Sequence, residues 1–140
     1  MELLNWEYFL AIEDDLINAS RFVEFAETNF KTFSIEFARI LFASSSEFDV
    51  MAKALCHEIE STQRPKNIDE YRKIILSQFP KFPSFEIKIP RYGLILKPWN
   101  SWQANDNPTW WNSYNNVKHE RNRCYQEATL ENAIYATAGL

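Results

Sequence analysis

The stretch that decides the fold is residues 34–63, SIEFARILFASSSEFDVMAKALCHEIESTQ. Its apolar residues recur every three or four positions, which is the spacing of one face of an α-helix. That face consists of Phe37, Ile40, Leu41, Phe48, Met51, Leu55 and Ile59. Ser34 is a favourable N-cap, and Pro65 cannot continue a helix. The sequence therefore predicts one long helix that starts after Ser34 and runs to about Gln63, or about eight turns.

Two further helices are predicted on either side of this one. From Leu3 to Phe25, apolar residues recur at helical spacing with acidic side chains between them. Asn67 followed by Glu70 resembles a capping pair and predicts a short helix over residues 68–78. The small residues Ser44, Ser45 and Ser46 in the long helix favour close packing against a neighbouring helix, and they lack the glycine-flanked elbow of a serine hydrolase.

Residues 80–98 interrupt the helical pattern. Four prolines break any helix there, and Phe85, Ile87 and Ile89 alternate with Glu86 and Lys88. We expect a short β-hairpin or extended insertion near residues 84–96. Since an isolated hairpin is marginal, it must lie on the helices or on a partner.

The last part of the chain returns to helical spacing. Asn107 before Pro108 predicts a helix start, with Pro at its first position and the helix running from Thr109 to about Tyr125. Another apolar helix is expected from Thr129. These patterns together predict an all-α helical bundle with a small β insertion, in which residues 1–140 form a single domain.

The composition narrows the function. With only 2 Gly in 140 residues, most all-β folds and phosphate-cradling glycine loops are disfavoured. The net charge of −4 excludes a constitutively basic nucleic-acid coat protein. Cys56 and Cys124 fit a reducing compartment, and we see neither a secretory signal nor an apolar run of about 18 residues. We therefore expect a cytoplasmic protein with no membrane span.

A dense polar cluster occupies residues 110–123, WWNSYNNVKHERNR. On a continuous helix Asn115, Lys118, His119 and Asn122 would share one face, with Asn112 and Ser113 one turn earlier. A metal-free ribonuclease needs an acid–base group and cations for the phosphate charge. His119 fits the first role, Lys118, Arg121 and Arg123 fit the second, and Asn115 fits the orientation of a hydroxyl. A solvated helix face is the competing interpretation.

Other features have a structural and a functional interpretation. The tryptophans at 99, 102, 110 and 111 can stack on unpaired bases or close the core or an interface, and we favour core or interface. The basic stretch from Arg64 to Lys97 is a candidate for phosphate contact or a plain solvated surface. His57 is expected at the edge of the core, and no zinc-ligand spacing is present, so we expect no metal and no cofactor.

Three stretches resemble the HEPN superfamily of prokaryotic α-helical domains. They are Tyr8 to Glu13, Asn29 to Arg39, and Trp111-x-x-Tyr114-Asn115-x-Val117-Lys118-His119-x-Arg121. The resemblance implies a HEPN-like bundle and a metal-independent endoribonuclease of toxin–antitoxin, abortive-infection or CRISPR-linked systems. It also implies a homodimer in which two motifs face each other, with RNA as substrate and an antitoxin or other defence-system protein as partner.

The family motif is Arg, a polar residue, three more residues and then His. Asn115 matches the polar position and His119 the His, while Tyr114 stands where the family has Arg. Tyr carries no positive charge at neutral pH, so we expect Lys118 or Arg121 to supply the cation. Trp111, Asn112 and Arg123 are the expected nucleic-acid contacts. If no cation replaces the Arg, the domain is a non-catalytic relative that binds RNA, a nucleotide or a partner.

Overall fold

The computed structural model describes residues 3–140. Within them the chain forms six α-helices and a two-stranded antiparallel sheet, so the predicted all-α architecture with a small hairpin is confirmed. The elements are α1 (Leu3–Ala19), α2 (Ile35–Ile59), α3 (Ile68–Gln78), β1 (Ile87–Ile89), β2 (Leu94–Leu96), α4 (Thr109–His119), α5 (Arg121–Cys124) and α6 (Leu130–Gly139).

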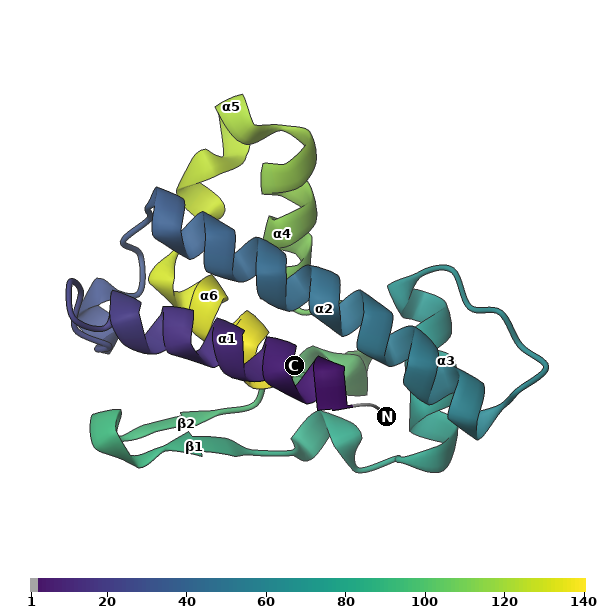
Figure 1. The fold of residues 1–140 in the computed structure, drawn as a ribbon. Helices are drawn as coiled ribbons and strands as arrows, with labels where there is room; N and C mark the ends of the chain where they lie inside the picture. Colours follow the sequence, from purple (N-terminus) through teal and green to yellow (C-terminus); the bar gives the residue numbers. More distant parts are fainter. Residues whose placement is uncertain (1–2) are drawn as a thin grey trace.

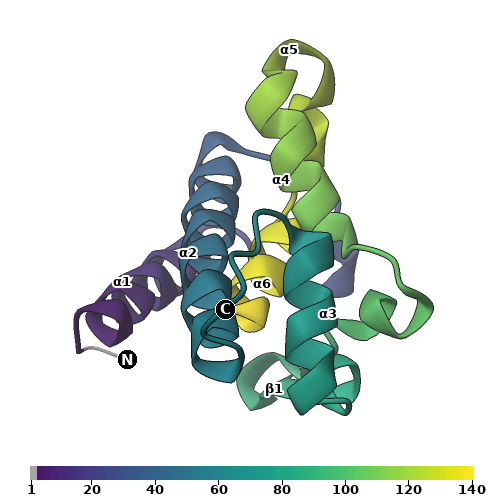
Figure 2. The same cartoon turned by 90° about the vertical axis from the view of Figure 1, so that its right-hand side faces the viewer.

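The long helix α2 is the centre of the bundle, as Figures 1 and 2 show. It contacts α1, α3, α4 and α6. Its start is fixed as predicted, because Ser34 Oγ accepts a hydrogen bond from the Phe37 N–H at 3.1 Å. It ends at Ile59, earlier than predicted, because Glu60 leaves the helical conformation with φ −143° and ψ 89°.

Small residues bring α2 and α6 close together. Ser44 and Ser45 are fully buried, and the Ser44 and Thr137 hydroxyl oxygens lie 3.0 Å apart. Thr137 Oγ1 also donates to the Ala133 carbonyl at 2.9 Å. The predicted role in close helix packing is therefore confirmed for Ser44 and Ser45, whereas Ser46 is exposed on α2.

The first helix is shorter than predicted. It ends at Ala19, and a turn follows in which the Phe22 and Val23 N–H groups both donate to the Ala19 carbonyl. Phe25, expected on the helix, instead reaches the core from the segment after this turn and is 4% exposed. The apolar periodicity continues past the true helix end because Phe25 is buried from a non-helical backbone.

The third helix matches its predicted span of residues 68–78. Asn67 Oδ1 accepts from the Glu70 N–H at 3.0 Å, as expected for the N-cap. The reciprocal bond of a capping box, from the Asn67 N–H to the Glu70 carboxylate, is replaced by one from the Lys66 N–H at 2.6 Å. One of the unpaired N–H groups of the first turn, that of Glu70, is thus satisfied by the cap.

The hairpin lies on the helices, as its marginal intrinsic stability requires. Leu94 and Leu96 of β2 are buried in a cluster with Leu16, Phe25 and Ile134, while β1 lies along the outside of the molecule (Figure 1). Gly93 closes the turn with a φ of 65°, a conformation that favours glycine.

Tryptophans fill a second core cluster, to which α2, α3 and α4 contribute. Trp99, Trp102 and Trp110 are at most 4% exposed and pack against one another and Phe48. Trp110 Nε1 donates to the Pro98 carbonyl at 3.1 Å. The tryptophan-rich segment is therefore core, which confirms the interpretation that the sequence favoured.

No helix within residues 3–140 is both long enough and apolar enough to cross a membrane. The two cysteines are free thiols in the structure, with Cys56 buried and Cys124 half-buried.

Candidate functional site

The polar cluster of residues 110–123 does not form one helix. The helix α4 ends at His119 because Glu120 leaves the helical conformation with φ −133° and ψ 53°, and a separate turn, α5, begins at Arg121. The predicted continuation to Tyr125 is wrong, and Asn122 does not share the helical face of Asn115 and His119. We call residues 118–123 the tip, since α4 and α5 project from the bundle there (Figures 1 and 2).

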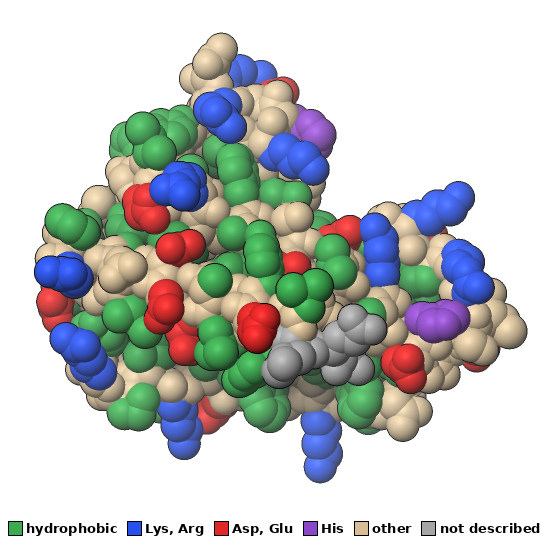
Figure 3. Space-filling model, in the orientation of Figure 1, with side chains coloured by type: hydrophobic (Ala, Val, Ile, Leu, Met, Phe, Trp, Pro, Cys, Tyr) green, Lys and Arg blue, Asp and Glu red, His purple; other side chains and the backbone are tan. Residues whose placement is uncertain are grey.

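The tip is the most exposed part of this region. Lys118, His119, Arg121 and Arg123 are all exposed. Figure 3 shows Lys, Arg and His side chains gathered at this end of the molecule. The segment carries three fixed positive charges and one negative charge, from Glu120. An incoming phosphate therefore meets a local positive potential on a chain whose net charge is negative.

Each cation at the tip has a different local partner. The Lys118 ammonium lies 3.4 Å from the Tyr114 hydroxyl and 5.4 Å from the centre of its ring. The Arg121 guanidinium lies 5.8 Å from the centre of the Phe42 ring. Within the part of the chain that the structure describes, only Arg123 of these forms an ion pair, with Glu120 at 3.2 Å. Lys118 and Arg121 thus rest on aromatic surfaces and keep donors available for an anion.

His119 stands at the C-terminal end of α4 with an exposed imidazole. Within residues 3–140 its side chain takes part in no hydrogen bond or ion pair. Asn115 lies one turn earlier on the same face, half-buried, with its Nδ2 donating to the Trp111 carbonyl at 3.1 Å. That bond orients the amide and leaves Oδ1 as an acceptor.

Tyr114, at the position where the resembling family has Arg, is a core residue that is 9% exposed. Its ring packs edge-on against Phe42, with 5.8 Å between centroids, and against Trp111 at 5.4 Å. Only the hydroxyl reaches toward the tip, through the contact with Lys118. The motif position is therefore turned into the bundle, while Asn115 and His119 face outward.

The expected nucleic-acid contacts are divided between the core and the surface. Trp111 is half-buried and packs on Trp110, Phe48 and Tyr114. Its ring is therefore largely occupied by protein, which leaves little of it for a base. Asn112 is exposed on α4, about two turns before His119. Arg123 is exposed but tied to Glu120.

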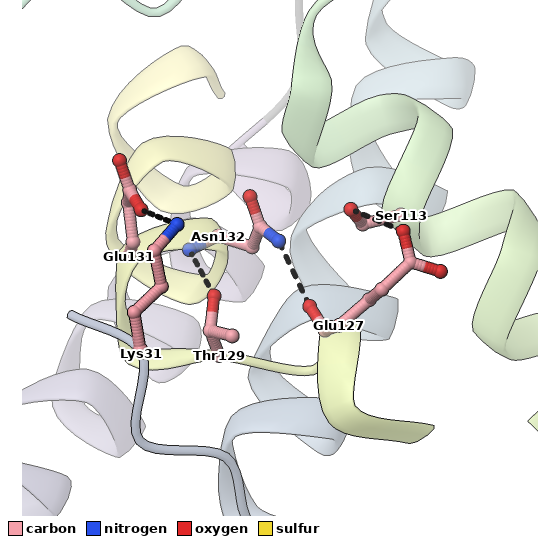
Figure 4. A network of polar contacts seen from close by, with 6 residues as sticks. All are labelled: Lys31, Ser113, Glu127, Thr129, Glu131 and Asn132. Carbon is pink, nitrogen blue, oxygen red and sulfur yellow. Dashed lines mark hydrogen bonds and ion pairs between the residues drawn. The ribbon is translucent and has the colours of Figure 1, made fainter. Parts of the chain in front are cut away.

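A polar network that the sequence did not reveal fastens the segment after the tip (Figure 4). The Glu127 carboxylate accepts from Ser113 Oγ at 3.4 Å and from Asn116 Nδ2 at 3.3 Å. The Glu127 carbonyl accepts from Asn132 Nδ2 at 2.8 Å. Glu127 thereby links α4 to α6 and fixes the base of the tip. No short motif signals it, because its partners on α4 lie 11 and 14 residues earlier in the chain.

The remaining cysteine, histidine and acidic candidates do not form a second catalytic or metal site among the described residues. Burial, together with the nearby Glu127 carboxylate, raises the pKa of the Cys124 thiol, so it stays protonated and unreactive near neutral pH. His57 is exposed rather than at the core edge as expected. In the part of the chain that the structure describes, no three His, Cys, Asp or Glu side chains are arranged to hold a metal ion.

The basic stretch from Arg64 to Lys97 does not gather into one site. Arg72 is buried at the foot of α3, where it pairs with Asp69 at 3.2 Å and donates to Asn107 Oδ1 at 3.1 Å. Lys97 pairs with Glu86 across the hairpin at 3.7 Å. The Asn107 side chain therefore accepts from Arg72 and does not cap α4, which starts at Thr109 as predicted but with Pro108 at the N-cap position.

A large groove lies away from the tip. Its volume is about 990 Å³, and it runs between α1, the hairpin and α6 with a mainly apolar lining that includes Phe9, Leu16 and Ile89. None of the motif residues lines it. Comparisons of the chain with protein-family models, with curated proteins and with solved structures found no match.

Proposed function

We propose that the chain is a HEPN-like protein whose tip binds RNA and cleaves it without a metal ion. The observation that carries this proposal is the placement of His119. Among the described residues its exposed imidazole has no protein partner, and it stands beside Lys118 and Arg121, whose donors remain available for phosphate oxygens. Histidine is the side chain that most often transfers protons in enzyme sites.

The proposed reaction is a transesterification within the RNA. His119 takes the proton of a 2′-hydroxyl, whose oxygen attacks the neighbouring phosphorus. The bond from phosphorus to the 5′-oxygen breaks, and that oxygen receives a proton from His119 or from water. The products are a 2′,3′-cyclic phosphate and a 5′-hydroxyl, and the reaction requires no metal ion and no oxidant or reductant.

The remaining motif residues have separate roles in this proposal. Asn115 Oδ1 accepts from the 2′-hydroxyl and orients it, since its Nδ2 is held by the Trp111 carbonyl. Lys118 and Arg121 stabilise the charge that develops on the phosphate oxygens. Tyr114 acts indirectly by holding Lys118 through its hydroxyl. The resemblance assigns the biological setting, an effector of phage defence or of a toxin–antitoxin system with an antitoxin or similar partner.

The burial of Tyr114 favours the second candidate, a non-catalytic HEPN-like interaction module. In this alternative no cation stands at the motif position, and the tip binds RNA, a nucleotide or a partner protein without cleaving. Loss of a charge-assisted contact of this kind costs about 10²–10³ in rate.

A cleavage assay separates the two candidates. A mixed RNA substrate is incubated in EDTA with the wild type, with His119→Ala and with His57→Ala, purified identically. We expect cleavage by the wild type and His57→Ala but not by His119→Ala, with cyclic-phosphate ends on the product. His57 is the matched control because it is the other histidine of the chain and is also exposed.

Equal cleavage by all three proteins would refute the role of His119. If none of them cleaves, fluorescence anisotropy with labelled RNA tests whether the tip binds RNA without cleaving it. Binding that weakens with Arg121→Ala and with added salt would support the interaction module. Absence of both cleavage and binding would reject RNA as the ligand of the tip.

A further inference from the structure

The outer edge of the hairpin is an open strand edge. The sheet has two strands, so β1 pairs with β2 on one side only. Within residues 3–140 no backbone group of Ile87–Ile89 hydrogen-bonds outside the hairpin. Figure 1 shows β1 as the outer strand of the hairpin, and its residues Ile87, Lys88 and Ile89 border the groove that α1 and α6 also line. Such an edge is a template for pairing with another strand.

The side chains along this edge alternate in character. The segment reads Phe85-Glu86-Ile87-Lys88-Ile89, and the observed register pairs Ile87 with Leu96 and Ile89 with Leu94 on the core-facing side. Glu86 and Lys88 therefore share the outward face. Lys88 forms no ion pair within the described chain, and Glu86 has only the long 3.7 Å contact with Lys97. Phe85 is 65% exposed, although it follows the core-facing alternation.

We propose that β1 pairs with β1 of a second copy of this chain, in antiparallel orientation with Ile87 opposite Ile87. In that register Glu86 of each copy stands opposite Lys88 of the other, which gives two opposite-charge cross-strand pairs. Phe85 stands opposite Ile89 of the second copy, and the exposed ring gains an apolar neighbour. The surface is thus complementary to itself, as an isologous two-fold interface requires.

Charge selects this register over its neighbours. A one-residue shift of the two-fold axis to Glu86 sets two carboxylates directly opposite each other, and a shift to Lys88 sets two ammonium groups opposite each other. Like charges in directly opposed positions destabilise a strand pair. Only the axis through Ile87 pairs each charge with its opposite. It also keeps the core-facing sides of both hairpins on the same side of a four-stranded sheet.

The interface is short and separate from the tip. Pro90 follows Ile89 directly and lacks an N–H, so the ladder ends there. We therefore expect a concentration-dependent dimer. The tip lies at the opposite end of the molecule from the hairpin (Figure 1), so the two tips of this dimer point apart. This arrangement differs from the facing motifs that the HEPN resemblance implies, and the proposal stands whether or not the tip cleaves RNA.

Charge reversal tests the proposal by sedimentation at protein concentrations up to about 1 mM, where weak interfaces associate. We expect the wild type to shift from 16.6 kDa toward twice that mass as concentration rises. Glu86→Lys and Lys88→Glu alone each place like charges opposite one another and should raise the dissociation constant about tenfold or more. Lys73→Glu on α3, an exposed site with the same change in net charge as Lys88→Glu, should leave it unchanged.

The mixture of the two variants is the decisive measurement. Combined in equal amounts, Glu86→Lys and Lys88→Glu form opposite-charge pairs again, so association should return as a heterodimer. The double variant Glu86→Lys/Lys88→Glu should likewise dimerise as the wild type does, and circular dichroism confirms that each variant is folded. A wild type that stays monomeric overturns the proposal, as does a dimer that Lys88→Glu leaves intact or a mixture that does not associate.

Discussion

Replacing Tyr114 by arginine would restore the family motif at the level of sequence, but we expect it to damage the fold. The ring is 9% exposed and packs on Phe42 and Trp111. Removing a buried aromatic side chain costs about 3–5 kcal/mol of unfolding free energy. The aliphatic part of an arginine recovers some of that packing, yet its charge would lie beside Lys118 in a partly buried site. We expect a net loss of about 3 kcal/mol.

Urea denaturation followed by tryptophan fluorescence measures this loss. Tyr114→Phe is the matched control, because it keeps the ring and removes only the 3.4 Å contact with Lys118. Its cost should stay below about 1 kcal/mol, the value of an ordinary hydrogen bond. Since the introduced guanidinium would lie in a partly buried site and repel the Lys118 ammonium, Tyr114→Arg should also show no gain in RNA cleavage over the wild type.

The reasoning would be refuted if Tyr114→Arg unfolded within about 1 kcal/mol of the wild type. That result would mean that the side chain at this position reaches solvent at little cost. Position 114 would then be available to the tip, and the departure from the family motif would be a change within the site itself. A rise in RNA cleavage by the same variant would support that conclusion.

Three further predictions concern the bundle. Burial and the Asp49 carboxylate raise the pKa of Tyr71 above its ordinary value, so the native state keeps its proton where the unfolded chain loses it. Stability should therefore hold below about pH 10 and fall above it, and Tyr71→Phe should flatten that fall in urea titrations across alkaline pH. Asn67→Ala removes the α3 cap and should cost about 1 kcal/mol in thermal or urea unfolding, whereas Asn67→Ser should cost only a few tenths. Ser44→Leu forces a larger side chain between α2 and α6 at the contact with Thr137, so it should cost about 1–3 kcal/mol or more, and Ser44→Ala should cost less.

Local chemistry explains which expectations from the sequence are confirmed. Ser34 and Asn67 cap α2 and α3 as predicted, because a side-chain oxygen three residues before a backbone N–H is a contact within one turn. The hairpin follows from period-two alternation and from prolines that exclude a helix. The tryptophans of residues 99–110 are core because large apolar rings are rarely left in water.

The sequence did not reveal the whole site, because parts of it depend on contacts between segments far apart in the chain. The pattern of residues 110–123 is compatible with a continuous helix, and nothing local in it marks Glu120 as the end of α4. Which face of α4 turns inward is set by Phe42 on α2, far from Tyr114 in the chain, and by the tryptophan core. Glu127 joins the site only because the chain turns back after α5.

By itself, then, the sequence determined the helical class, the hairpin, the starts of α2 and α3, and the pairing of Asn115 with His119 on one helical face. These features depend on contacts within one or two turns, which composition and spacing encode directly. The tertiary structure alone decided that Tyr114 is buried, that the tip breaks away at Glu120, and that β1 presents an open edge. Those outcomes depend on which distant surfaces meet in the bundle, and no local pattern specifies such contacts.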